Sequence, residues 1–153
     1  MNRIEAIKYI INKHLDAAII FSNGLTSREA SYITDRRGNF YMLHAMGEAL
    51  SVGIGLKSFR KDLEVVVVEG DGNAIMGLSS ITNLPIEGLY YYILDNEVYE
   101  TTGSQATPRL NLDNSICNII KISKGSIGAP NPPSPDIIIG NFKGWINGLT
   151  KEG

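Results

Sequence analysis

Residues 65–73 read Val-Val-Val-Val-Glu-Gly-Asp-Gly-Asn, and this stretch decides the fold class. Four consecutive β-branched residues are stiff at χ1 and suit a strand that is buried on both faces, as in a parallel sheet. The Gly-Asp-Gly sequence ends that strand, and we expect a helix over residues 74–84, just before Pro85. A strand that passes through a glycine turn into a helix is the repeating unit of α/β folds.

The same alternation extends to both sides of this unit. Short apolar runs predict further strands at residues 17–21, 40–43, 90–94 and 137–139. Helical spacing of apolar or small residues predicts helices at residues 3–14, 45–57, 116–122 and 142–150, with an ordered loop at 95–111 and a proline-rich connector at 130–135. We therefore predict an α/β fold, a mainly parallel sheet flanked by helices, in a single domain over residues 1–153.

The predicted helix at 45–57 is unusually rich in small residues, including Gly47, Gly53 and Gly55. Each glycine costs an exposed helix about 1 kcal/mol relative to alanine, so these residues would weaken it. We expect them to allow close backbone packing against a sheet or a ligand.

Composition excludes several classes of function. The 153 residues are 43% hydrophobic and carry 14 basic against 16 acidic side chains, so no broad basic surface for nucleic acid or acidic membranes is expected. No apolar run approaches the roughly 18 residues of a membrane span. The single cysteine, Cys117, excludes an internal disulfide and a cysteine-based zinc site. A reducing, cytoplasmic setting is expected.

Polar side chains follow two of the predicted strands. Asp71 comes directly after the valine strand, and Asn96 follows the strand at 90–94. Parallel strands joined by one helix end at the same edge of the sheet, so these side chains should converge. A carboxylate, an amide oxygen and a main-chain carbonyl suit Mg²⁺, which also binds phosphates. Gly70 and Gly72 would let the backbone approach a ligand, and a helix starting near Asn73 would direct N–H groups at a diphosphate.

These residues resemble a known family. Gly70-Asp71-Gly72-Asn73, followed by Leu94-Asp95-Asn96, is similar to the diphosphate-binding motif of thiamine-diphosphate enzymes. Four further stretches resemble phosphonopyruvate decarboxylases and the β subunits of sulfopyruvate decarboxylases: Thr26-Ser27-Arg28-Glu29, Gly38-Asn39-Phe40-Tyr41-Met42, Ala45-Met46-Gly47 and residues 96–107. The resemblance covers residues 4–125 and implies the cofactors thiamine diphosphate and Mg²⁺.

The resemblance also implies roles for individual residues. It makes Asp71, Asn96 and the Val98 carbonyl the metal ligands. It assigns diphosphate contacts to Gly47, Gly70, Gly72 and Asn73. Met46 would hold the cofactor bent between its rings, and the His44 carbonyl would accept the pyrimidine amino group. Tyr99 and Gln105 are the residues expected to reach the reacting substrate.

Three positions depart from the family pattern. Asp95 stands where the family usually has Asn, His44 where it has Gly, and Tyr99 where it has His. Asp95 does not occupy the metal position and His44 would use only its carbonyl, so the site should survive. The chain also ends at Lys151-Glu152-Gly153, where the family usually continues into a final strand.

The resemblance further implies half an active site. In this family a glutamate of a separate pyrimidine-binding domain activates the cofactor, and this chain has room for the diphosphate-binding domain alone. We therefore expect one subunit of a heterooligomeric decarboxylase that releases CO₂ and an aldehyde from a small anionic 2-oxoacid, such as phosphonopyruvate or sulfopyruvate. The partner subunit would supply the glutamate.

Two alternatives stay open. The chain could serve a carboligase of the acetolactate synthase type, or it could be a non-catalytic regulatory subunit. The intact pair Asp71 and Asn96 speaks against the second alternative. Arg28 is most simply a solvated charge, with contact to an anionic substrate or a partner chain as its alternative role.

Overall fold

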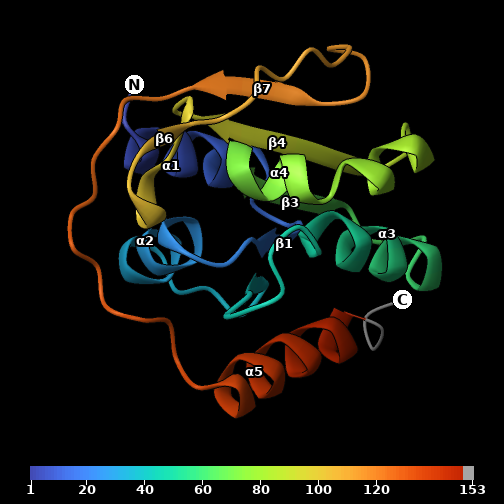
Figure 1. The fold of residues 1–153 in the computed structure, drawn as a ribbon. Helices are drawn as coiled ribbons and strands as arrows, with labels where there is room; N and C mark the ends of the chain where they lie inside the picture. Colours follow the sequence, from blue (N-terminus) through green and yellow to red (C-terminus); the bar gives the residue numbers. More distant parts are fainter. Residues whose placement is uncertain (150–153) are drawn as a thin grey trace.

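The computed structural model describes residues 1–149 and has five parallel strands in one sheet (Figure 1). Their order is β2-β1-β3-β4-β7. The strands are β1 (Ala18–Phe21), β2 (Asn39–Tyr41), β3 (Val65–Gly70), β4 (Leu89–Asp95) and β7 (Asn118–Lys121). Strand β2 lies on one side of β1 and β3 lies on the other, so the strand order reverses at β1. The predicted α/β fold is confirmed.

Five α-helices and two short 3-10 helices accompany the sheet within residues 1–149. The α-helices are α1 (Arg3–Lys13), α2 (Leu25–Ile33), α3 (Ala49–Phe59), α4 (Asp71–Met76) and α5 (Pro135–Gly148). The 3-10 helices are η1 (Leu78–Asn83) and η2 (Glu100–Thr102), and β5 (Val98–Tyr99) forms a small antiparallel hairpin with β6 (Gln105–Ala106). None of the helices within residues 1–149 has the length and apolar character that crossing a membrane would require.

The valine run of β3 is covered on both faces, as the sequence predicts. Val65 to Val68 are each 0% exposed. Val66 and Val68 pack in one core cluster with residues of α1 and α2, whereas Val65 and Val67 pack in a second cluster with residues of α3 and α4. Alternate side chains of a strand point to opposite faces, so each face of the sheet has its own apolar layer.

Two secondary-structure predictions near the C-terminus are wrong. Residues 118–121 form the edge strand β7 rather than a helix, because Ile119 and Ile120 pack into the clusters on opposite faces of the sheet. Residues 137–139 lie in helix α5 rather than in a strand. Pro135 occupies its first turn, and Ile138 and Phe142, four residues apart, are both buried. Helix α5 covers the edge strand β2 (Figure 1).

The starts of two helices also differ from the predictions, and the predicted loop contains regular structure. Helix α3 begins at Ala49 rather than at 45, because residues 44–48 form a turn. Helix α4 begins at Asp71 rather than at 74, and the chain continues as η1 after Gly77. The loop at 95–111 contains the β5–β6 hairpin. The predicted helix end at residue 150 lies outside the described residues.

Candidate active site

The segments that follow four strands meet in one pocket at the carboxyl edge of the sheet. The pocket has a volume of about 120 Å³ and is lined by residues after β1, β2, β3 and β4. It brings together eight of the sequence-predicted site residues at its wall: Met46, Gly70, Asp71, Gly72, Asn73, Asn96, Val98 and Tyr99. The pocket lies where strand order reverses, which is the usual ligand site of a doubly wound sheet.

Asp71 is a buried carboxylate that forms no ion pair with a basic residue within residues 1–149. Its side chain is 4% exposed, and its Oδ2 accepts a hydrogen bond from Thr107 Oγ1 at 2.6 Å. Burial raises the pKa of Asp71, the Thr107 hydrogen bond opposes this, and the charge of Asp95 raises the pKa further. A cation bound here would offset the electrostatic repulsion between the carboxylates of Asp71 and Asp95.

Asn96 offers the second oxygen of this arrangement. Its Oδ1 accepts a hydrogen bond from the Val98 N–H at 3.2 Å, and its Nδ2 donates to Glu100 Oε2 at 2.8 Å. No group of three His, Cys, Asp or Glu side chains suited to a metal occurs within residues 1–149. A cation would therefore need the amide, a main-chain carbonyl and oxygens of a ligand beside Asp71. This donor set fits Mg²⁺ shared with a diphosphate.

Met46 is held at the pocket by a strained turn. Ala45 and Gly47 on either side have φ angles of 63° and 82°. The Gly47 N–H donates to Asn73 Oδ1 at 2.9 Å, which ties the turn to α4. A Cβ on Gly77 would lie 2.2 Å from the Gly47 carbonyl oxygen, so the two backbones need glycine here. Met46 itself is 45% exposed.

Tyr99 packs against Gly72, the second residue of α4. A Cβ on Gly72 would lie 2.9 Å from Tyr99 Cδ1, so the ring occupies the space that a side chain would take. Tyr99 thus closes one side of the pocket. Gly72 has no side chain, and this leaves room for the Tyr99 ring.

Three predicted site residues lie away from the pocket wall. His44 is exposed and lines an apolar groove with Ile138 and Ile139. Gly47 is buried beneath the turn, and Gln105 is exposed in β6, opposite Tyr99. These placements concern this chain alone and test neither a carbonyl role for His44 nor a substrate role for Gln105.

Sequence reasoning missed a buried ion cluster that borders the pocket. Arg3 is 6% exposed, and its Nη2 lies 2.5 Å from Glu100 Oε2. Its Nη1 lies 3.4 Å from Glu29 Oε2, and Glu29 is 1% exposed. The Gly125 N–H also donates to Glu100. Since Glu100 also accepts a hydrogen bond from Asn96, this one carboxylate connects helix α1 to the Asn96 amide. No local sequence pattern could have paired residues this far apart.

Thr107 and Glu69 were also missed. Thr107 holds Asp71, as described above. Glu69 precedes the glycine turn, is 0% exposed and accepts a hydrogen bond from the Tyr91 hydroxyl at 2.6 Å. Burial raises the pKa of Glu69 to about 7. Its place in a run of valines gave the one available signal, an acidic residue inside a buried strand.

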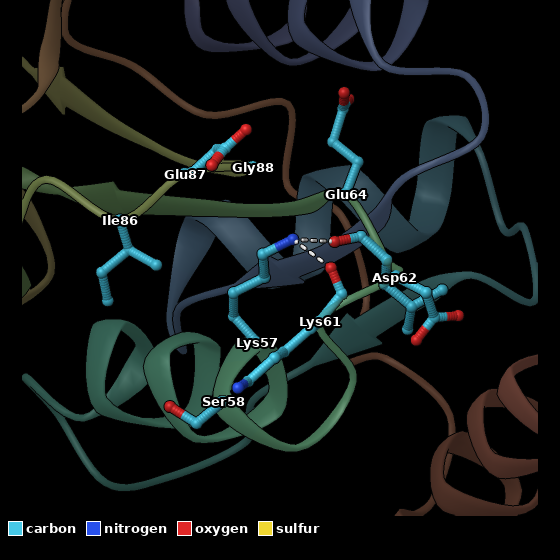
Figure 2. A pocket seen from close by; sticks show the side chains of 9 residues that line it. Lys57, Ser58, Lys61, Asp62, Glu64, Ile86, Glu87 and Gly88 are labelled. Carbon is cyan, nitrogen blue, oxygen red and sulfur yellow. Dashed lines mark hydrogen bonds between the residues drawn. The ribbon is translucent and has the colours of Figure 1, made fainter.

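A second cavity, of about 630 Å³, lies at the opposite edge of the sheet, among residues that precede β3 and β4 (Figure 2). Figure 2 shows the Lys57 ammonium directed at two backbone carbonyls. It donates to the Lys61 carbonyl at 3.0 Å and to the Leu63 carbonyl at 2.6 Å. Lys57 therefore closes a turn and is not free for a ligand, and this cavity shares no residue with the predicted site.

Comparison with known proteins agrees with the location of the pocket. Residues 22–124 match the family model described as "Thiamine pyrophosphate enzyme, C-terminal TPP binding domain". This span includes the segments that follow β1, β2, β3 and β4, and so contains every pocket residue except Arg3.

Individual relatives give a similar picture. The chain is 42% identical over 109 residues to sulfopyruvate decarboxylase subunit beta of Methanocaldococcus jannaschii, covering 69% of this chain and 57% of that protein. It is 43% identical over 94 residues to phosphonopyruvate decarboxylase of Streptomyces hygroscopicus, covering 60% of this chain and 23% of that protein. The chain thus spans little more than half the length of the first relative and about a quarter of the length of the second.

The fold is also found in a solved structure. A 2-oxoglutarate:ferredoxin oxidoreductase from Magnetococcus marinus superposes with a TM-score of 0.55 at 22% identity, over 91% of this chain and 47% of that one.

Proposed function

Because the chain belongs to the thiamine pyrophosphate enzyme family through its C-terminal-type TPP-binding domain, we propose that it is the diphosphate- and Mg²⁺-binding subunit of a two-chain 2-oxoacid decarboxylase. The observation that carries the proposal is the convergence of Asp71 and Asn96 in one pocket at the carboxyl edge of the sheet. Thiamine diphosphate, when bound, supplies the electron sink that decarboxylation of a 2-oxoacid requires.

This chain's residues would bind and orient the cofactor. Asp71, the Asn96 amide oxygen and the Val98 carbonyl would hold Mg²⁺, which would in turn hold the diphosphate. The backbone at Gly70 and Gly72 would lie against the diphosphate, and Asn73 would stabilise the turn that carries Met46. Met46 would support the rings from its place on that turn.

The substrate proposal comes from the relatives. Those named above are a sulfopyruvate decarboxylase subunit and a phosphonopyruvate decarboxylase. Both names describe a three-carbon 2-oxoacid with a second anionic group. We assign this chain to the same class of substrate. The bond between the carboxyl carbon and the keto carbon breaks, CO₂ leaves, and the keto carbon gains a proton to give an aldehyde. Tyr99 lines the pocket and offers a hydroxyl for this proton.

The partner proposal comes from the subunit naming of the relatives and from the pocket itself. Met46 remains 45% exposed at the pocket wall, although it is a large apolar side chain. We propose that a pyrimidine-binding subunit covers this wall and supplies the activating glutamate, giving a heterooligomer. We expect the complex in the reducing cytoplasm, where the lone Cys117 would stay a thiol.

The experiment compares the chain with and without its partner. The chain is purified alone, its purity is checked by mass, and CO₂ release from sulfopyruvate and phosphonopyruvate is assayed with added thiamine diphosphate and Mg²⁺. We expect no turnover by the chain alone and turnover after a pyrimidine-binding subunit is added. Robust turnover by the single chain would refute the two-chain proposal.

Product analysis of the complete complex tests the reaction itself. An aldehyde formed in equal amount to CO₂ supports decarboxylation, whereas a condensed hydroxy-ketone product would show a carboligase. Absence of CO₂ from every 2-oxoacid tested, with cofactor bound, would show a non-catalytic subunit.

A further inference from the structure

A polar groove continues outward from the cofactor pocket. It has a volume of about 610 Å³ and shares five lining residues with the pocket: Asn23, Gly24, Leu25, Glu100 and Thr101. One wall is the start of helix α2, with Ser27 and Arg28. The other wall is the connector between β7 and α5, with Ser126 and Asn131, which passes beside α2 in Figure 1.

The connector wall is fastened in place by the buried ion cluster. The Ile127 N–H donates to Glu29 Oε1 at 3.2 Å. Arg3 Nη1 donates to the Gly125 carbonyl at 2.9 Å, and the Gly125 N–H donates to Glu100. Ser126 lies between these two anchored residues, so this wall of the groove has a defined position although residues 123–134 form neither helix nor strand.

The same cluster engages the groove's one carboxylate, Glu100, and leaves the groove's arginine without an ion-pair partner among the described residues. Of the described residues that line it, only Arg28 and Glu100 are charged. Glu100 is taken by Arg3 and by the Gly125 N–H, and Glu29, which follows Arg28 in sequence, is buried against Arg3. Arg28 is exposed and forms no ion pair with any residue between 1 and 149. Arg28 is therefore the one charged side chain on the groove wall, among the described residues, that has no oppositely charged partner.

We propose that Arg28 binds the anionic tail of the 2-oxoacid, and that this contact selects sulfonate- or phosphonate-bearing substrates. The proposal rests on the proposed function for the identity of the ligand. A guanidinium presents a planar set of donors that can bond two oxygens of a sulfonate or phosphonate at once. Ser126, Asn131 and Thr101 add neutral polar groups around the same space.

The arrangement also places the two ends of a short substrate in different sites, the reacting end in the pocket and the anionic tail in the groove. The reacting end needs the pocket lined by Met46 and Tyr99, and the groove opens from that pocket through the shared residues Asn23 and Thr101. An acid with no second anionic group gains nothing from Arg28. Arg28 is thus a specificity-determining residue, and its loss should not affect cofactor binding.

The first test is kinetic and uses the complete complex with its partner subunit. Arg28→Ala should lower kcat/KM for sulfopyruvate at least tenfold, mainly through KM, and should leave kcat/KM for pyruvate within twofold. Arg28→Lys should recover part of the loss. Arg37→Ala, an exposed arginine just before β2 at the opposite edge of the sheet, is the matched control and should have no effect. An equal loss for both substrates, or no loss, would overturn the proposal.

The second test measures binding without turnover. The probes are 3-sulfopropanoate and propanoate, titrated calorimetrically into the complex loaded with thiamine diphosphate and Mg²⁺. We expect tighter binding of the sulfonate, lost at least tenfold in Arg28→Ala. Equal affinity of the wild type and the variant for the sulfonate would overturn the proposal. Arg28-dependent binding in a complex that releases no CO₂ would uphold this subsite and refute the decarboxylase function.

Discussion

Tyr91 in β4 donates its hydroxyl to Glu69 in β3, with 2.6 Å between Oη and Oε2. Glu69 is 0% exposed, and its Oε1 has no hydrogen-bond partner among the described residues. Burial is the main reason that the pKa of Glu69 rises from 4.5 to about 7, because the hydrogen bonds that oppose this shift do not replace the water lost by a carboxylate. The valine-rich strand therefore contains a carboxyl group that is costly to ionise, directly before the glycine turn.

This predicts a stability that depends on pH. The pKa of Glu69 is higher in the folded than in the unfolded chain, so the folded state holds the proton between pH 4.5 and 7 and loses stability as the pH rises through that range. The penalty is absent below the unfolded pKa and complete above about pH 7, where it reaches about 3 kcal/mol. Glu69→Gln should remove it and stay bonded to Tyr91.

The measurement is urea unfolding of both chains from pH 4.5 to 8, with a chelator present so that no divalent cation contributes. The gap in free energy of unfolding between Glu69→Gln and wild type should widen up to about pH 7 and then stay constant. Parallel pH profiles would show that Glu69 ionises normally.

Gly53 and Gly55 predict opposite effects of the same substitution within one helix. A Cβ on Gly53 would lie 2.3 Å from Val67 Cγ2, whereas a Cβ on Gly55 meets nothing within 4 Å. Gly53→Ala should therefore destabilise the chain by about 1–3 kcal/mol through overpacking. Gly55→Ala should stabilise it by up to about 1 kcal/mol through helix propensity. Thermal and urea unfolding of both variants would check the pair, and a loss in both would contradict the packing account.

Asp71→Asn tests the metal site. The substitution removes the carboxylate assigned to Mg²⁺ and leaves neutral oxygens against a divalent cation and a diphosphate. We expect the affinity of the complete complex for thiamine diphosphate and Mg²⁺ to fall at least tenfold, equivalent to about 1.4 kcal/mol. Calorimetry measures this directly. Asp16→Asn, an exposed aspartate before β1 with the same change of charge, is the control and should bind as the wild type does.

Arg3→Met tests the buried ion cluster. The variant keeps the length and apolar character of the side chain but leaves Glu29 and Glu100 without their shared cation. Removing one partner of a buried ion pair costs about 3–5 kcal/mol, and we expect a loss of stability of that order. Lys8→Met, on the exposed side of the same helix, should change the free energy of unfolding little. Equal effects of the two substitutions on denaturant unfolding would contradict a structural role for the cluster.

Local patterns in the sequence are sufficient to predict the fold class and the central strand. The valine run predicted a strand buried on both faces, and the alternation of strands and helices predicted a parallel sheet. Topology then required that the residues after β3 and β4 meet, so Asp71 and Asn96 could be placed at one edge without coordinates.

Tertiary structure decided the rest, because it depends on contacts between distant residues. Ile119 and Ile120 lie in a strand because their side chains pack against apolar clusters on opposite faces of the sheet. Residues 137–139 lie in helix α5, whose buried side packs against the edge strand β2. Arg3 reaches Glu100 across 97 positions of the chain. Charge pairing at such a separation leaves no periodic signal, so only the folded chain shows that Glu29 and Glu100 share Arg3 and that Arg28 forms no ion pair among the described residues.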